Sequence, residues 1–419
     1  MKSVLETTNF FMGNNPEDLV GEYGTPLYVY NERIIRDRMR AVSKLITKYP
    51  YTANYSVKAN SNTAILKIAL SEGINCDAVS EGEIRLLERV GYPYDKIFFV
   101  PNNVSDEELR YAIERGIMVS LDSLPQLERY GRLNGGSKCA LRINPGIGAG
   151  HHKKVVTAGK DTKFGISPEK IPEALEIAKR YNLTICGINQ HVGSLFMEPD
   201  PYVKASENIL KIAETIPNLE FVDLGGGMGT PYHKLDDEAS FDMTALHDAL
   251  EPVLDEFVKN YGYAPLFKSE PGRYCVSESS VILGRVYATK SHAGVNYAGT
   301  DIGMNVLARP TLYDSWHDVE ILRDGKPVTD GEKRNVTICG NICESGDKIT
   351  DNRELPVIKE EDLVCVLDTG AYGYSMSYTY NTRRRPAEIL ISPAASSGSE
   401  VKLIRKRETF EDLMALLCQ

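Results

Sequence analysis

Lys58 is the residue in this sequence whose position most suggests chemistry. It stands between a strand-like run, residues 51–57 (YTANYSV), and a helix-like run, residues 64–73 (AILKIALSEG). Aromatic and β-branched residues favour the strand, and the polar residues 60–63 offer N-cap oxygens for the helix. A lysine at the end of a strand is usually a solvated loop residue, so its neighbours must decide whether its amine is reactive.

The same strand-to-helix alternation recurs along the chain. Eight short apolar runs are expected as strands, and helix-like stretches follow the first seven, which predicts a parallel (β/α)8 barrel of TIM type within an α/β fold. The expected strands are residues 52–57, 74–79, 96–100, 117–121, 138–143, 184–190, 219–224 and 265–269.

A second domain is expected after the barrel because the later sequence is rich in β-type runs. We predict a barrel over residues 32–272 and a mostly β C-terminal domain over residues 273–419, whose expected strands include residues 275–291. The N-terminal segment 1–31 is too short to fold alone. Its strand-like run, residues 26–30 (PLYVY), is expected to pack with the β domain.

The composition of the chain limits the kinds of partner that the protein is expected to bind. The 419 residues carry 48 Lys plus Arg against 58 Asp plus Glu, a net charge of -10, which gives no attraction to nucleic acid or anionic lipid. Neither a signal-type N-terminus nor a membrane-spanning apolar run is evident, so a cytoplasmic protein with small-molecule partners is expected. The eight cysteines include no CxxC pair and predict neither a metal site nor disulfide bonds.

Polar or glycine residues follow all eight expected strands. Enzymes of the barrel type carry their reactive groups at the C-terminal ends of the strands, so these positions are expected to form one site. They are Lys58, Asp77 with Ser80, Asn102, Asp122, Arg142, His191, Gly225 to Gly227, and Glu270.

A phosphate-bearing cofactor is the ligand that these residues suggest. Gly225 to Gly227, in LGGGMG, can bring backbone N–H groups close to an anion, although a triple glycine alone is more often a flexible turn. Arg273 and Ser194 could bind the same phosphate. A phosphate site near a reactive lysine indicates pyridoxal phosphate, which forms a Schiff base with lysine.

Two further residues suit that cofactor. Glu270 could keep the pyridine nitrogen protonated, because a carboxylate beside the nitrogen favours its charged form. His191 could lie flat on the ring, although a lone histidine is more often a structural residue.

Seven motifs then make the resemblance specific. In chain order they resemble the fold-type III pyridoxal-phosphate decarboxylases from about Tyr28 to Ile391, and they are NYSVKAN, CDAVSEGEI, HVGS, DLGGG, EPGR, CESGD and GAYG. Within that family, RPTLY (309–313), CESGD (343–347) and YNTRRRPAE (380–388) are similar to the diaminopimelate decarboxylase branch. Alanine racemases share the fold type but lack the combination of HVGS, EPGR and CESGD.

The resemblance implies an architecture and a set of roles. It implies a barrel followed by a β domain, and a homodimer with two shared sites. Lys58 becomes the Schiff-base lysine, His191 the ring-stacking residue and Glu270 the partner of the pyridine nitrogen. The further cofactor contacts expected are Asp77, Ser194, Gly225, Gly226, Gly227, Gly272, Arg273 and Tyr372.

The implied reaction is decarboxylation of meso-2,6-diaminopimelate to L-lysine and CO2, the last step of lysine biosynthesis. Cys343, from the partner subunit, is the expected proton donor, with Lys58 as the alternative. At the far end of the substrate, a carboxylate and an ammonium group need partners, and guanidinium suits the carboxylate. The expected substrate contacts are Arg273, Arg309, Tyr313, Glu344 and Tyr372.

Two alternatives remain open at this stage. One is a related decarboxylase acting on ornithine, lysine or arginine, including D-configured forms; the other is a non-catalytic homologue that has lost the cofactor. The sequence departs from the branch at Leu195, where glutamine is usual, and in residues 155–165, VVTAGKDTKFG. Whether the loop 147–163 acts as a lid is also open.

Overall fold

The structure is a computed structural model that describes residues 2–146, 162–191 and 193–417. The chain divides into two compact units, which we describe one at a time. The barrel unit comprises residues 36–230 and 240–275, and the β unit comprises Met1–Ile35, Pro231–Ala239 and Val276–Gln419. Residues 231–239 fall inside the range that the sequence assigned to the barrel, but they belong to the β unit.

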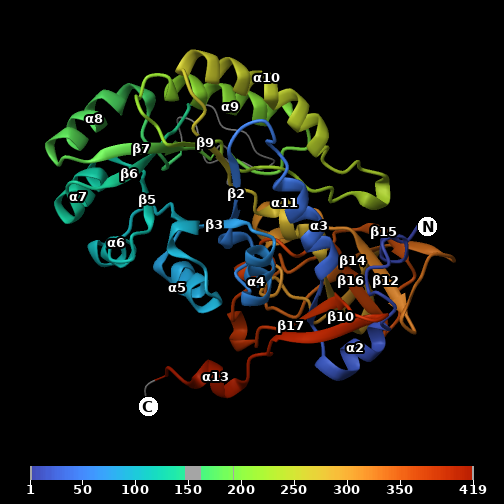
Figure 1. Ribbon diagram of the computed structural model, residues 1–419. Coiled ribbons are helices and arrows are strands. Elements are labelled where there is room, and N and C mark those ends of the chain that lie inside the picture. The colour runs from blue at the N-terminus through green and yellow to red at the C-terminus, as the bar shows by residue number, and fades with distance from the viewer. Residues whose placement is uncertain (1, 147–161, 192, 418–419) are drawn as a thin grey trace. The chain divides into compact units, whose positions relative to one another are not determined.

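Eight parallel strands close the barrel in the order β2 to β9 (Figure 1). Each of them coincides with one of the eight strands expected from the sequence, so the predicted (β/α)8 architecture is confirmed. The strands are β2 Tyr51–Ser56, β3 Asn75–Ala78, β4 Ile97–Phe99, β5 Met118–Leu121, β6 Lys138–Arg142, β7 Thr184–Asn189, β8 Phe221–Asp223 and β9 Leu266–Ser269.

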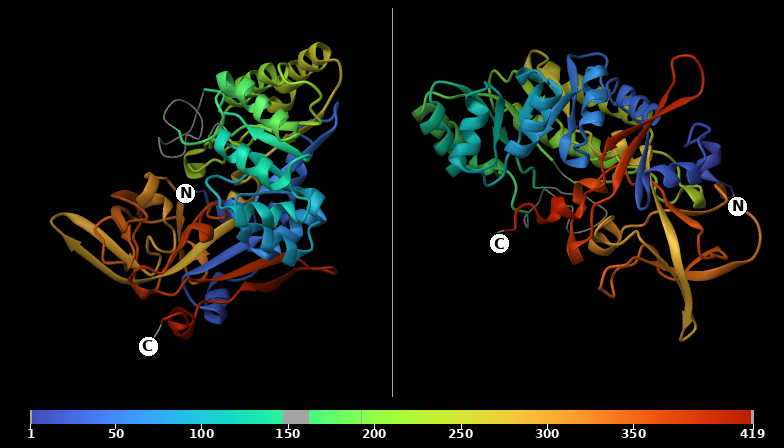
Figure 2. Two further views of the ribbon diagram at one scale, coloured as in Figure 1. Left: turned by 90° about the vertical axis from the view of Figure 1, so that its left-hand side faces the viewer. Right: turned by 90° about the horizontal axis from the view of Figure 1, so that it is seen from below.

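Helices alternate with these strands and pack around their outside (Figures 1 and 2). Side-chain caps begin several of them: Asn62 accepts a hydrogen bond from the amide of Ala64, as expected, and Ser80 accepts one from the amide of Glu83. The helices are α3 Glu32–Val42, α4 Thr63–Ser71, α5 Glu81–Val90, α6 Asp106–Ile113, α7 Leu124–Asn134, α8 Ile171–Arg180, α9 Asp200–Ala213, α10 Met243–Tyr261 and α11 Arg273–Val276.

An apolar layer fills part of the barrel interior. Phe98, Val100, Ala140, Cys186 and Phe221 form one buried cluster, and the rings of Phe98 and Phe221 meet edge to face at 5.5 Å. Residues from well-separated strands of a closed barrel can meet in this way only inside it. Burying each large side chain stabilises the fold by about 1.5–3 kcal/mol.

The β unit is built on one large mixed sheet. Strand β1 pairs antiparallel with β10 and parallel with β17, so the N-terminal strand joins the β domain as predicted. Residues 275–279 were expected to begin a strand, but the chain is helical there until β10 begins at Ser280. The strands are β1 Leu27–Asn31, β10 Ser280–His292, β11 Val295–Thr300, β12 Val319–Arg323, β13 Lys326–Pro327, β14 Lys333–Cys339, β15 Arg353–Pro356, β16 Leu363–Val366, β17 Ala387–Pro393 and β18 Ser399–Arg405.

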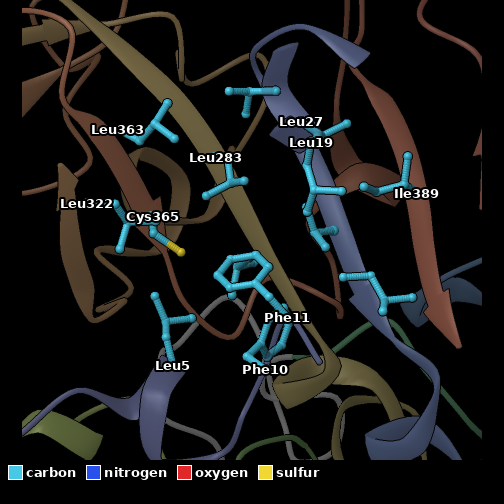
Figure 3. Packing of buried hydrophobic residues seen from close by; sticks show 14 of the residues in the cluster. Leu5, Phe10, Phe11, Leu19, Leu27, Leu283, Leu322, Leu363, Cys365 and Ile389 are labelled. Atoms are coloured by element: carbon cyan, nitrogen blue, oxygen red, sulfur yellow. The ribbon is translucent and has the colours of Figure 1, made fainter. Parts of the chain in front are cut away.

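Short helices complete the β unit and help to cover its core. They are α1 Val4–Thr7, α2 Pro16–Tyr23, α12 Arg309–Tyr313 and α13 Phe410–Met414. Phe10, Phe11 and Leu19, from the N-terminal segment, pack against Leu283 of β10 and Ile389 of β17 (Figure 3). The N-terminal segment therefore completes the hydrophobic core of this unit. No helix of the described chain is both long and apolar enough to cross a membrane.

Candidate functional site

Lys58 lies where the sequence placed it, at the C-terminal end of β2. It belongs to a short 3-10 turn, Val57–Ala59, and its side chain is about one third exposed. The hydroxyl of Tyr55 donates to the carbonyl oxygen of Asn60 at 2.9 Å, which fixes the turn from below. The amine of Lys58 lies 3.5 Å from a carboxylate oxygen of Asp77, at the end of the neighbouring strand β3.

Three buried carboxylates gather at the same ends of the barrel strands: Asp77, Asp223 and Glu270 are each at most 2% exposed. Burial raises the pKa of Glu270 well above its usual value, and the charges of Asp223 and Asp77 raise it further, against Lys58 and Arg142. Burial likewise raises the pKa of Asp223 to about 7. Glu270 and Asp223 therefore resist ionisation, and a further cation beside them would favour their charged forms.

Glu270 is held in one orientation by a short chain of hydrogen bonds. Ser120 donates to the side-chain oxygen of Asn189 at 2.6 Å, so the amide nitrogen of Asn189 faces Glu270 and donates to it at 3.3 Å. All three residues are buried on different barrel strands or strand ends. This arrangement aims the second carboxylate oxygen of Glu270 toward His191, whose Nδ1 lies 3.8 Å away.

His191 follows β7 and is expected to be neutral. Burial lowers its pKa well below the usual value, and the positive charges of Lys58 and Arg142 lower it further. A neutral imidazole can lie against a cationic aromatic ring without charge repulsion. The His191 ring also passes close to the glycine loop, since a Cβ added at Gly226 would lie 3.6 Å from its Cε1.

The glycine loop needs glycine for space. A Cβ at Gly225 would lie 2.4 Å from the carbonyl oxygen of Gln190, and one at Gly226 would lie 2.1 Å from that of Glu270. Gly225 and Gly227 also have positive φ values, +81° and +124°. Backbone atoms cannot move aside as a flexible side chain can, so the loop presents its main chain uncovered.

This loop and two side chains form a cradle suited to phosphate. The guanidinium Nε of Arg273 donates to the hydroxyl of Ser194 at 3.0 Å. Within the described residues, the amides of Gly226 and Gly227 make no hydrogen bond to a protein oxygen. Free amides, a hydroxyl and a guanidinium are the donors that phosphate prefers. The residues present therefore fit pyridoxal phosphate, with an amine at Lys58 for its aldehyde and a carboxylate at Glu270 for its ring nitrogen.

In the β unit, the CESGD loop packs against the YNTRRRPAE segment. The amide of Cys343 donates to the side-chain oxygen of Asn381 at 3.0 Å, and the amide nitrogen of Asn381 lies 3.0 Å from the Cys343 sulfur. The hydroxyl of Tyr380 donates to Glu344 at 2.7 Å. The hydrogen bond of Tyr380 to Glu344, and next its hydrogen bond with Cys343, raise the pKa of Tyr380 to about 12. Cys343 and Glu344 are thus neighbours on an exposed loop.

Arg309, also in the β unit, is 1% exposed and begins helix α12. Its Nη1 lies 2.7 Å from Nε2 of His317, and Nδ1 of His317 lies 2.7 Å from the carbonyl oxygen of Leu367. Because a carbonyl only accepts, Nδ1 of His317 carries the proton and Nε2 accepts from Arg309. The ring of Tyr232 lies 4.6 Å from the guanidinium carbon.

The remaining predicted residues are placed as follows. Tyr313 ends α12, and the hydroxyl of Thr311 in that helix donates to Gly346 of the CESGD loop at 2.9 Å, so the RPTLY and CESGD motifs adjoin. Tyr372 has a positive φ of 58° in the loop after β16, and Gly272 lies between Glu270 and Arg273. Residues 147–161, most of the expected lid loop, lie outside the described residues.

The sequence reasoning missed several residues of these clusters. Asp223 and Asn189 were passed over inside apolar strands, although a lone polar residue at a strand end is the same signal that singled out Asp77. Tyr380, Asn381 and His317 lie in or just beyond motifs that were used only for the resemblance. Their contacts depend on tertiary structure and had no local signal.

The barrel and its cradle define a class of proteins, the pyridoxal-phosphate enzymes built on a (β/α)8 barrel followed by a β domain. The chain matches the protein-family model described as pyridoxal-dependent decarboxylase, pyridoxal binding domain, over residues 32–277. It belongs to this pyridoxal-dependent decarboxylase family.

Individual relatives and solved structures show which members of this family the chain resembles. The chain is 36% identical to a diaminopimelate decarboxylase of Methanothermobacter thermautotrophicus over 411 residues, which cover 96% of this chain and 94% of the relative. A crystal structure of diaminopimelate decarboxylase superposes with a TM-score of 0.89 at 30% identity, covering 97% and 98% of the two chains. The M. jannaschii enzyme in complex with L-lysine gives a TM-score of 0.85 at 31% identity, covering 95% and 93%.

Proposed function

We propose that this protein decarboxylates meso-2,6-diaminopimelate to L-lysine and CO2, the last step of lysine biosynthesis, with pyridoxal phosphate as its cofactor. The observation that carries the proposal is the set of Lys58, Asp77, His191 and Glu270 at the strand ends of the barrel, with Asp77 and Glu270 buried, within a chain that resembles diaminopimelate decarboxylases over nearly its whole length. The complex of one such relative with L-lysine accords with lysine as the product.

Lys58 would hold the cofactor covalently through its amine, and the glycine loop, Ser194 and Arg273 would hold its phosphate. Asp77, 3.5 Å from the Lys58 amine, keeps that amine oriented, and Gly272 and Tyr372 complete the cofactor contacts. When bound, pyridoxal phosphate supplies an electron sink for the bond pair released as CO2 departs.

Glu270 and His191 adjust how strongly the cofactor ring withdraws electrons. Glu270 would hydrogen-bond the ring nitrogen, and a protonated nitrogen would add a further cation to those of Lys58 and Arg142 beside this carboxylate. His191, neutral because burial lowers its pKa, packs on the ring face and excludes water from it. Asn189 holds the carboxylate of Glu270 in place for this contact.

Arg309 and Tyr313 bind the distal carboxylate of the substrate, and Glu344 binds the distal ammonium. The fixed tautomer of His317 directs the Arg309 guanidinium, so the site favours a planar carboxylate over other groups. Arg273 and Tyr372 also contact the substrate. A substrate that lacks the distal carboxylate forgoes this contact with Arg309 and is disfavoured.

The carbon from which CO2 departs needs a proton. Cys343 of the partner subunit in a homodimer donates it, with Lys58 as the alternative donor. The Cys343 thiol is exposed and held by Asn381, and an accessible, oriented thiol suits proton transfer to a substrate. A homodimer with two shared sites follows from this assignment.

Two measurements test the proposal. CO2 release and product identity should be measured with meso-diaminopimelate, lysine, ornithine and arginine, in L and D forms. We expect turnover of diaminopimelate to exceed that of the others by about 100-fold or more, because the others lack the distal carboxylate that Arg309 would bind. Equal turnover of ornithine or lysine would replace this function with that of a related diamino-acid decarboxylase.

The cofactor assignment has its own test. Borohydride reduction of the holoenzyme followed by peptide mapping should label Lys58, and Lys58→Ala should bind cofactor only non-covalently. Lys67, on the helix that follows, is the matched control, since Lys67→Ala should leave labelling unchanged. Label on any other lysine would disprove the role of Lys58. An absence of cofactor would favour the non-catalytic alternative.

A further inference from the structure

The β unit contains a pocket of about 510 Å³ that the proposed reaction does not use. Its walls include Arg383 and Arg384 of the basic run, Arg407, Asp301, Asn305 and Phe410. None of the residues assigned above to cofactor or substrate is among its described lining residues. Its volume lies within the range of small-molecule sites.

The pocket has an excess of positive charge. Three guanidinium groups face one carboxylate, that of Asp301, in a protein whose net charge is -10. Among the described residues, neither Arg383 nor Arg384 has a carboxylate within salt-bridge distance. Arg385, the next residue of the same basic run, is neutralised by Glu408, to which its Nε donates at 2.7 Å. Among the described residues, the basic run therefore brings two guanidinium groups without a salt bridge to this pocket, and Arg383 also interacts over a longer distance with Asp347.

Arg407 is anchored in the wall. Its Nη2 donates to the carbonyl oxygens of Pro26 at 2.7 Å and Tyr23 at 3.3 Å. Burial lowers the pKa of Arg407, and the nearby charge of Arg384 lowers it too, while Asp301 raises it. Two guanidinium groups close enough to repel would both be stabilised by an anion bound between them.

Arg384 packs beside an aromatic ring. Its guanidinium carbon lies 4.7 Å from the centre of the Phe410 ring, which is the distance of a cation–π contact. A guanidinium carries five N–H donors, which suit a carboxylate or phosphate. Phe410 itself is 55% exposed, which leaves room for a ligand beside it.

Buried amides add a second kind of contact. Asn305 is 1% exposed, and its side-chain oxygen has no hydrogen-bond partner among the described residues; the same holds for the side-chain oxygen of Asn341 in the same wall. A buried polar atom without a partner costs about 1–3 kcal/mol. A ligand bearing an N–H or O–H group could remove that cost.

We propose that this pocket binds a small molecule with at least two negative charges, carried by carboxylate or phosphate groups, and with one hydroxyl or amino group. The proposal stands on the β unit alone and does not depend on which amino acid the enzyme decarboxylates. The net charge of -10 gives the chain no general attraction to nucleic acid, so a small anion is the favoured occupant.

The test uses the holoenzyme, so that the cofactor already fills the phosphate cradle. Calorimetric titrations with citrate and with inorganic phosphate separate carboxylate from phosphate ligands, because the tighter probe identifies the chemistry. We expect saturable binding of at least one probe with one site per chain. Arg384→Ala and, independently, Arg383→Gln should weaken it by about tenfold or more. Arg384→Lys should recover only part, since a point charge cannot replace the planar fork.

Arg89→Ala is the matched control, since Arg89 is an exposed arginine at the end of α5 in the barrel unit. Its binding should equal that of the unaltered protein. Equal loss in the Arg89 variant would show a general charge effect and overturn the proposal. So would the absence of saturable binding, or binding that competes with the amino-acid substrate and is unchanged by Arg384→Ala. Decarboxylase activity of each variant reports that it is folded.

Discussion

Replacing Asp223 with asparagine should change how the stability of the protein depends on pH. Asp223 is fully buried at the end of β8. Its Oδ1 accepts from the amide of Gly225 at 2.9 Å, and its Oδ2 has no hydrogen-bond partner among the described residues. Asparagine keeps the first contact and removes the titration, so Asp223→Asn isolates the cost of the charge.

The direction of this pH dependence follows from the raised pKa of Asp223. Burial raises the pKa of Asp223 from 3.8 to about 7, so between these values the folded protein holds a proton that the unfolded chain has lost. Asp223 therefore leaves the free energy of unfolding at its full value below about pH 4. It lowers that free energy progressively as the pH rises from about 4 toward 7. Between about pH 5 and pH 8 the loss from this one group is about 2–3 kcal/mol.

Urea denaturation of the cofactor-free protein across that pH range measures the effect. The free energy of unfolding of the unaltered protein should fall relative to that of Asp223→Asn by about 2–3 kcal/mol between pH 5 and pH 8. Asp95→Asn, which removes an exposed carboxylate from the same unit, should show no such divergence. Parallel curves for the unaltered protein and Asp223→Asn would refute the argument, because they would mean that Asp223 is already ionised at pH 5.

Three further outcomes are expected. Gly226→Ala should lower stability by about 1–3 kcal/mol and weaken cofactor absorbance, because its Cβ would lie 2.1 Å from a backbone oxygen, whereas Gly21→Ala, with open space around it, should do neither. Arg309→Ala should lower kcat/KM for diaminopimelate by about 10- to 100-fold with cofactor absorbance unchanged, and Arg309→Lys should recover only part of it; unchanged discrimination against lysine would contradict the assignment. Mixing inactive Lys58→Ala with inactive Cys343→Ala should restore part of the activity, and no recovery despite proven subunit exchange would place Cys343 in its own subunit's site or outside catalysis.

The local sequence was sufficient for the elements of the fold. The alternation of short apolar runs with amphipathic ones located all eight barrel strands, because strand and helix periods are local properties of the chain. Caps such as Asn62 and Ser80 could be read in the same way. The chain from 275 to 279 was misread as strand because β-branched and small residues there are followed directly by a true strand.

The positions of the candidate site could also be named largely from the sequence. Lys58, His191 and Glu270 could be singled out because a parallel barrel brings every strand end to one face, whatever its loops do. The motifs then tied these positions to one cofactor. Asp77 was singled out in the same way, and the structure places its carboxylate near Lys58.

The pKa shifts at the site and the hydrogen-bond partners of its residues depend on the tertiary structure alone. The raised pKa values of Glu270 and Asp223 come from burial beside each other, and no spacing in the sequence records that distance. The tautomer of His317 is set by the carbonyl of Leu367, fifty residues away, and it directs Arg309. Such contacts join segments that are distant along the chain, and the energies that matter depend on separations of a few ångströms that only the folded chain fixes.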